Sequence, residues 1–246
     1  MTPPKSTPKH PPNSTPKNSP RQSSCSVMIN GQDVTLNSDG TALFDGGGVL
    51  VVSDLHLEKG RALSKTAPMP LYDTDATLDA LDAAIKRDKP RQLICLGDSF
   101  HRAELAASLA ASYQDRINAM TDGIDVIWIT GNHDPHLPDF LPGVAKAEHQ
   151  TASLWFRHMA EDEITAGEVS GHYHPKVSIK TRARRISGKC FVHNGMRLIM
   201  PSFGAFTGGL SVFDPAIKQF FPKGGEIIFC HACQVYRYPY SQVITT

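Results

Sequence analysis

Three short apolar runs, rich in β-branched residues, recur in the first part of the chain, and each ends in a cluster of polar residues. They cover residues 49–52, 92–96 and 125–130. Their length and composition are typical of buried strands. The polar residues that follow them include Asp54, Asp98 and Asn132. Because ligands bind beyond the carboxyl ends of parallel strands, we expect the functional site at this edge.

Helical periodicity separates the three runs. Leu78, Leu81 and Ile85 have helical spacing behind a cap at Asp73 or Thr74, and an alanine-rich stretch continues the pattern from Leu105 to Ile117. Alternating strands and helices predict a largely parallel sheet with right-handed crossovers.

After residue 150 the helical pattern fades and short strand-like segments follow one another. This half predicts a second, mostly antiparallel sheet. Its expected strands are 153–157, 163–170, 177–182, 189–193, 197–200, 209–213 and 226–230.

The first 24 residues differ from the rest in composition. They contain seven of the 18 prolines, many Ser and Thr residues and four basic side chains. Such a segment cannot bury enough apolar surface to fold, so we expect a disordered basic tail over 1–24 and one domain over 25–246. The tail is either a solubilising extension or a weak attachment to a polyanion.

Overall charge excludes a protein that holds nucleic acid by bulk charge alone, since 25 basic and 24 acidic residues give a net charge of +1. No apolar run could span a membrane and no secretory signal is evident, so a cytoplasmic protein is expected. The five cysteines are then expected to be free thiols. Cys230 and Cys233 could suggest zinc, but one pair without a second is more typical of structural residues.

Potential metal ligands gather at the predicted strand ends. Residues two apart in an extended segment face the same way, so Asp54 can converge with His56, and His172 with His174. Two carboxylates, one amide and four imidazoles are too many for one ion and predict a two-metal centre with a bridging carboxylate. The seven residues are Asp54, His56, Asp98, Asn132, His158, His172 and His174.

The motifs Asp54-x-His56, Gly97-Asp98, Gly131-Asn132-His133-Asp134, His158 and Gly171-His172-x-His174 resemble those of the calcineurin-like metallophosphoesterase superfamily. This resemblance implies an αββα sandwich of two mixed β-sheets. It implies one metal at Asp54, His56 and His174, a second at Asn132, His158 and His172, and Asp98 as the bridge.

The same resemblance gives His133 a role beside the metals. It would protonate the leaving group or stabilise the transition state. Asp134 would then orient its imidazole, with a simple turn cap as the alternative. The oxygen and nitrogen ligands suit Mn²⁺, which the resemblance favours, and also accept Fe²⁺, Zn²⁺, Ni²⁺ or Co²⁺.

Sequence around the motifs is similar to that of the bacterial ligase-associated metallophosphoesterases, notably Ser53–Gly60 and Leu198–Gly209. Their resemblance implies a manganese-dependent DNA endonuclease or phosphodiesterase acting on single-stranded or damaged DNA, associated with a DNA ligase and a helicase in repair. A small-molecule phosphodiesterase or pyrophosphate hydrolase is the alternative, and a non-catalytic scaffold would not need two complete metal sites.

Basic residues after the last ligand are candidates for substrate binding. In an extended segment Lys176, Lys180, Arg182 and Arg184 share one face and could form a stripe that leads from the metals along a DNA backbone. An edge strand that carries charge against aggregation is the alternative. Near the ligands, further phosphate-binding candidates, each of which could instead be structural, are Lys59, His101 and Arg102.

Overall fold

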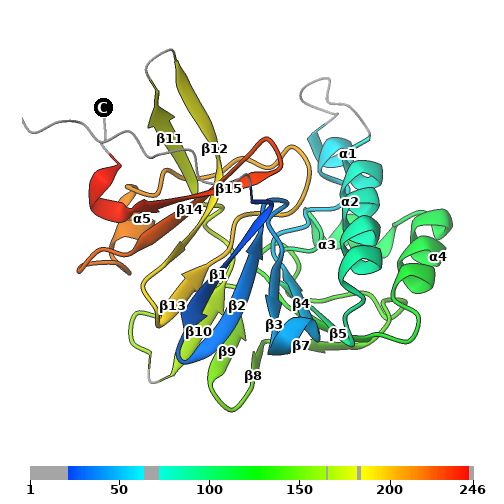
Figure 1. The fold of residues 1–246 in the computed structure, drawn as a ribbon. Helices are drawn as coiled ribbons and strands as arrows, with labels where there is room; N and C mark the ends of the chain where they lie inside the picture. Colours follow the sequence, from blue (N-terminus) through cyan, green and yellow to red (C-terminus); the bar gives the residue numbers. More distant parts are fainter. Residues whose placement is uncertain (1–21, 64–71, 165, 182–183, 244–246) are drawn as a thin grey trace, which may run out of the picture.

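A computed structural model describes residues 22–63, 72–164, 166–181 and 184–243 (Figure 1). Most of the predicted tail, residues 1–21, lies outside the described residues. Within the described part, Gln22 accepts a hydrogen bond from the Val235 amide at 2.9 Å, and Ser24 opens β1 (Ser24–Ile29). The last three residues assigned to the tail therefore contact the domain.

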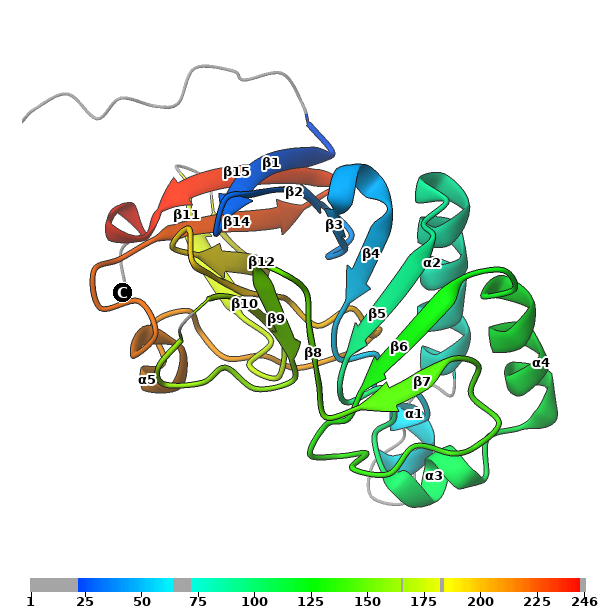
Figure 2. The same ribbon diagram turned by 90° about the horizontal axis from the view of Figure 1, so that it is seen from below.

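The first sheet has the strand order β1-β2-β3-β4-β5-β6-β7 (Figures 1 and 2). The three predicted strands are its centre and pair in parallel. The meander from β1 to β4 is antiparallel, so only half of this sheet follows the predicted parallel pattern. The other strands are β2 (Gln32–Asn37), β3 (Ala42–Phe44), β4 (Val49–Val52), β5 (Gln92–Leu96), β6 (Asp125–Ile129) and β7 (Val144–Lys146), with a 3-10 turn η1 (Asp45–Gly47) before β4.

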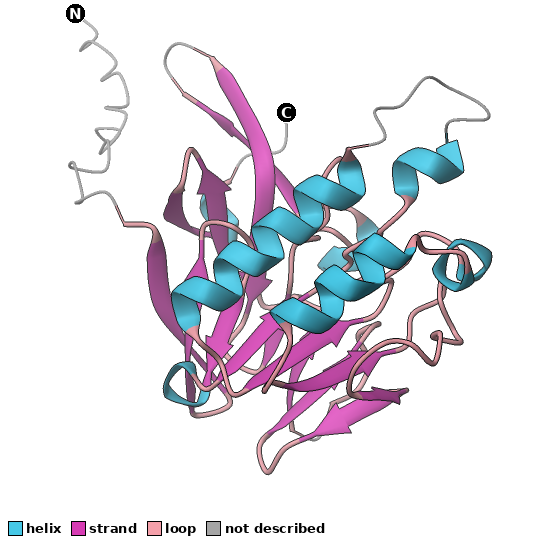
Figure 3. Ribbon diagram, turned by 90° about the vertical axis from the view of Figure 1, so that its right-hand side faces the viewer, coloured by secondary structure: helices cyan, strands magenta, loops and turns pink. Residues whose placement is uncertain are grey.

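Helices cover the outer face of this sheet (Figure 3). They are α1 (Lys59–Leu63), α2 (Asp73–Asp88), α3 (Ala103–Ala107) and α4 (Ala111–Met120). The predicted caps of α2 are wrong: its N-cap is Tyr72, while Asp73 and Thr74 accept hydrogen bonds from the α1 region. The second helical pattern is split in two, because Ala110 adopts an extended conformation between α3 and α4.

The second sheet has the order β15-β14-β12-β13-β10-β9-β8, and β11 pairs with β12 beside it. It is mixed, since β10 is parallel to both β9 and β13. The predicted strand at 209–213 is absent: Ser211 makes one isolated bridge to Lys176, and α5 (Pro215–Lys218) follows. The strands of this half of the molecule are β8 (Glu148–Gln150), β9 (Leu154–Arg157), β10 (Gly167–Ser170), β11 (Lys176–Lys180), β12 (Arg185–His193), β13 (Arg197–Ile199), β14 (Glu226–His231) and β15 (Gln234–Pro239). A 3-10 turn, η2 (Tyr240–Gln242), follows β15.

Three apolar clusters define the layers. Residues such as Leu36 and Phe191 fill the space between the two sheets, and Leu81 and Trp128 belong to the cluster between the first sheet and its helices. On the outer face of the second sheet, Ile217 of α5 and nearby loop residues cover the strands. The structure is thus the expected sandwich of two mixed sheets, with a thin fourth layer.

Candidate metal centre

The carboxyl ends of β4, β5, β6, β9 and β10 bring all the predicted ligands to one edge of the sandwich. Two groups of potential ligand atoms form there, each with its atoms within 4.8 Å of one another. The first group comprises Asp54, His56 and His174, and the second comprises Asp98, His158 and His172. The first group has the three residues that the resemblance implies for one metal. The second group contains Asp98, which the resemblance implies as the bridge, and Asn132 lies beside it.

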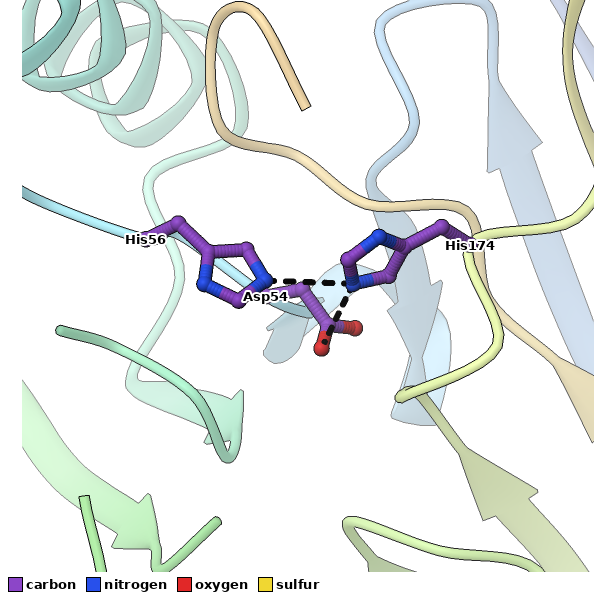
Figure 4. A group of neighbouring side chains, drawn as sticks. All are labelled: Asp54, His56 and His174. Atoms are coloured by element: carbon purple, nitrogen blue, oxygen red, sulfur yellow. Dashed lines mark hydrogen bonds and ion pairs between the residues drawn. The ribbon is translucent and has the colours of Figure 1, made fainter. Parts of the chain in front are cut away.

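In the first group, two imidazoles and a carboxylate face a common point (Figure 4). The Nε2 atoms of His56 and His174 lie 3.2 Å apart, and Nε2 of His174 lies 3.0 Å from Oδ1 of Asp54. The other carboxylate oxygen of Asp54 accepts hydrogen bonds from the Ser53 hydroxyl and the His172 amide. These contacts leave Oδ1 of the fully buried Asp54 turned toward the imidazoles, without a hydrogen bond.

In the second group, His158 is the central side chain. Its Nδ1 lies 2.9 Å from the carbonyl oxygen of Leu96 and must donate to it, because a carbonyl only accepts. Nε2 is therefore the nitrogen that faces the site, and it has a lone pair to offer there when the imidazole is neutral. Asn132 Oδ1 lies 3.0 Å from this Nε2, His172 Nδ1 lies 3.1 Å from it and Asp98 Oδ1 lies 3.4 Å from it.

Burial and neighbouring charges shift the pKa values of titratable groups in the site. Burial lowers the pKa of His56 to about 3, so this imidazole is neutral. Burial raises the pKa of Asp98, but the hydrogen bond and charge of His158 outweigh burial and bring it to about 2. Burial lowers the pKa of His158, yet the carboxylates of Asp98 and Asp54 raise it to about 9. The buried carboxylates thus attract positive charge, here a proton on His158.

These residues fit divalent metal ions. Two pairs of imidazole nitrogens face each other at 3.1 and 3.2 Å, and only a proton or a cation between them relieves the repulsion of their lone pairs. The donors are oxygen and nitrogen atoms without a thiolate, the set that suits first-row divalent ions. The chain therefore carries a divalent metal centre, and the ligand atoms do not single out one metal.

Backbone conformation contributes to the geometry. Asp54, His56, Asp98, His172 and His174 all have positive φ, between 46° and 68°. Side chains other than glycine rarely adopt this conformation, and such strain concentrates at functional sites. Two motif glycines make the approach possible: a Cβ on Gly131 would lie 2.1 Å from Asp98 Oδ1, and one on Gly171 would lie 1.8 Å from Ser53 Oγ.

His133 lies beside the centre without belonging to either group of three. Its Nε2 is 3.9 Å from Oδ2 of Asp98, and its Nδ1 is 3.0 Å from the carbonyl oxygen of His101. Nδ1 therefore donates to this carbonyl, and Nε2 faces the site. The side chain is 41% exposed, so a substrate can reach it.

Asp134 does not orient this imidazole, which corrects its predicted role. Its carboxylate accepts backbone hydrogen bonds from Asp98 at 3.1 Å, from Gly131 at 2.9 Å and from Phe100 at 3.0 Å. The carboxylate is fully buried beneath the loop that carries Asp98. Asp134 is thus closer to the alternative of a turn cap, and a backbone carbonyl, which sequence motifs do not reveal, orients His133.

The predicted substrate-binding residues lie in two places along the chain. Lys59 and His101 are half-buried, Arg102 is exposed, and the His101 ring stacks on His133 with centroids 5.3 Å apart. Arg184 is exposed after β11, whereas Arg182 lies outside the described residues.

The cysteines stand apart from the metal centre. All five are free thiols, as expected. Cys230 is buried in β14, Cys233 is exposed at the following turn, and neither belongs to a potential metal group among the described residues.

Comparison with known proteins agrees with this geometry. The sequence profile of the calcineurin-like phosphoesterase family matches residues 48–201, which span every residue of the two groups. The chain belongs to the calcineurin-like phosphoesterase family. It is therefore a metal-dependent hydrolase of phosphoester bonds.

Among solved structures, the fold is similar to the crystal structure of the Pseudomonas putida nuclease MPE. The TM-score is 0.67 at 24% sequence identity, and the match covers 87% of this chain and 100% of that one. At this identity the likeness establishes the fold. The search of curated protein sequences gave no match. Among the described residues, no helix is long and apolar enough to cross a membrane.

Proposed function

We propose that this protein is an endonuclease that hydrolyses phosphodiester bonds of DNA, single-stranded or damaged, at a two-metal centre. The pair of adjacent ligand groups carries the two-metal part of the proposal. Two divalent ions held there would neutralise the phosphate oxygens and activate a water molecule.

Each side chain of the site has a separate proposed role. Asp54, His56 and His174 would hold one ion, and Asn132, His158 and His172 would hold the other. Asp98, a member of the second ligand group, would be the carboxylate that the two ions share. His133, when protonated, donates a proton from Nε2 to the leaving oxygen, while the His101 carbonyl keeps its ring in place.

The arm formed by β11 and β12 supports DNA as the substrate. It begins two residues after His174 and projects from the body of the molecule (Figure 1). Its register places Lys180 opposite Arg185, and Ser178 opposite Ser187 on the same face. Lys180 and Arg185 thus present two basic side chains on one face of the arm, and basic side chains of this kind bind the phosphates of a nucleic acid.

The proposal includes several finer points. Mn²⁺ is the favoured metal, the cell compartment is the cytoplasm, and the enzyme works in DNA repair with a DNA ligase and a helicase. The phosphate-binding residues near the ligand groups are Lys59, His101 and Arg102, together with Arg184, which follows β11, and Arg182, which precedes Arg184 in the sequence.

Cleavage of a covalently closed single-stranded DNA circle tests the proposal. Metal-stripped protein is supplied with Mn²⁺, and Asn132→Ala is the inactive control. Nicking by the wild type alone establishes an endonuclease, because a circle offers no ends. An intact circle together with hydrolysis of bis-p-nitrophenyl phosphate would contradict the endonuclease and indicate a small-molecule phosphodiesterase.

The arm has its own test. Arg182→Ala with Arg184→Ala should weaken DNA cleavage and flatten its dependence on salt concentration, because each lost phosphate contact reduces counterion release. Hydrolysis of bis-p-nitrophenyl phosphate should be unchanged. Equal loss on both substrates would instead indicate a defect of folding or of metal binding.

A further inference from the structure

The loop that follows β13 lies against both halves of the first ligand group. The amide of Gly204 donates to the carbonyl of Asp54 at 3.1 Å. Further along, Gly209 approaches the backbone of His174 so closely that a Cβ there would lie 2.2 Å from its carbonyl oxygen. In Figure 4 this loop is the pale orange trace that passes beside Asp54 and His174.

Phe206 lies between these two contacts and is turned outward. Its surface is 59% exposed, whereas that of Phe203, on the same loop, is 6% exposed. Phe206 also has a φ of 58°, a conformation that costs energy for a bulky residue. Two residues span at most about 7 Å, so this aromatic ring is attached close to Gly204 and hence to the metal ligands. Neither hydrophobic burial nor backbone preference accounts for the position of Phe206.

Cations stand next to this loop. Lys176 donates from Nζ to the carbonyl of Thr207, the residue after Phe206, at 3.3 Å. Burial and the ammonium group of Lys176 lower the pKa of Lys59, so the two lysines are close enough to repel each other. Together these residues offer an aromatic face and two positive charges at the edge of a phosphoesterase site. Single-stranded nucleic acids are bound by this combination of stacking and charge.

We infer that Phe206 is a stacking platform for a nucleobase adjacent to the scissile phosphate. The inference rests on the proposed function and adds the residue that selects the substrate. In a duplex both faces of each base are already stacked on neighbours, so only an unpaired base can lie on Phe206. Lys59 and Lys176 contact the phosphates on either side. The platform thus makes the site prefer single strands.

Two oligonucleotides of equal length separate stacking from charge. One is oligothymidylate, and the other is its abasic counterpart, which keeps the sugars and phosphates. The wild-type protein should cleave the first with a higher kcat/KM. Phe206→Ala should lower kcat/KM on oligothymidylate about 5- to 150-fold and leave the abasic strand unchanged, and Phe206→Tyr should restore the preference.

A binding measurement gives a readout without catalysis. Metal-stripped wild-type protein should change the fluorescence of a single-stranded oligonucleotide that contains 2-aminopurine, because stacking on an aromatic ring quenches this base. Phe206→Ala should remove the change. Met196→Ala is the matched control, since Met196 is 41% exposed and precedes β13, at the end opposite to the loop.

The outcomes are distinct. Equal kcat/KM of wild type and Phe206→Ala on oligothymidylate, or an equal loss on both strands, overturns the platform while DNA cleavage itself stands. A wild-type protein that cleaves neither strand but hydrolyses bis-p-nitrophenyl phosphate overturns the proposed function, and the platform with it.

Discussion

Nδ1 of His133 lies 3.0 Å from the backbone carbonyl oxygen of His101, and this contact fixes which nitrogen of His133 faces the metal ligands. The carbonyl can only accept, so Nδ1 carries a proton and Nε2 is the atom that exchanges one with a substrate. A backbone atom thus sets the tautomer of His133, and the His101 ring stacks on the imidazole from one side.

His133→Ala should therefore lower kcat by about 10²- to 10⁴-fold for a phosphodiester with an alkoxide leaving group, because the proton donor is lost. The loss should be much smaller with p-nitrophenolate, which leaves without protonation. Steady-state kinetics on both substrates, together with metal content, tests this. The same loss on both would contradict the proton-donor role.

Asp134→Ala should lower the free energy of unfolding by about 3 kcal/mol or more, because the backbone amides that it binds would lose their acceptor in a buried loop. Asp134→Asn should cost less, since its carbonyl oxygen can still accept. Urea denaturation measures both variants. Unchanged stability together with a shifted pH profile of kcat would instead mean that Asp134 acts through His133.

Glu226 provides a pH-dependent contribution to stability far from the metal centre. Burial raises the pKa of Glu226, but the hydrogen bonds and charge of Arg237, at 2.6 and 2.9 Å, outweigh burial and hold it below 4.5. Because the pKa of Glu226 is lower in the folded state than in the unfolded state, its ionised carboxylate stabilises the folded state at pH values above the pKa of the unfolded state. This stabilisation is lost as the pH falls through the pKa of the folded state. Glu226→Gln should lower the free energy of unfolding by about 1 kcal/mol at pH 7.

The difference in the free energy of unfolding between wild type and Glu226→Gln should become smaller below pH 4.5. Urea denaturation at a series of pH values measures it. Asp45→Asn is the matched control, because its ion pair with Arg91 is exposed on both sides and should contribute almost nothing. A difference that stays constant from pH 7 to pH 4 would contradict the assignment to Glu226.

Sequence predicted the parts of the structure that depend on local pattern. The buried strands β4, β5 and β6 follow from their apolar runs, and α2 buries the three residues with helical spacing. The residues of the two ligand groups could be predicted because their spacing and their position after strands are themselves the motif. Asp54 and His174, 120 residues apart in the chain, meet because β4 of the first sheet and β10 of the second sheet end at the same edge of the sandwich.

Other features depend on tertiary contacts that leave no local pattern. The meander β1 to β3 lacks the long apolar runs of central strands. The segment at 209–213 has the composition of a strand. In the structure, however, Gly209 lies against the backbone of His174, and the segment makes only one isolated bridge, at Ser211. Asp134 follows His133 directly, which suggested a contact between them, yet its buried position makes it a ligand of backbone amides instead.

Anomalous diffraction from a crystal of the full chain soaked in Mn²⁺ shows whether the site holds two ions. We expect two peaks, one among Asp54, His56 and His174 and the other among Asp98, Asn132, His158 and His172. His174→Ala should lose the first peak and keep the second. A single peak shared by both groups, or none at these residues, would contradict the two-metal centre.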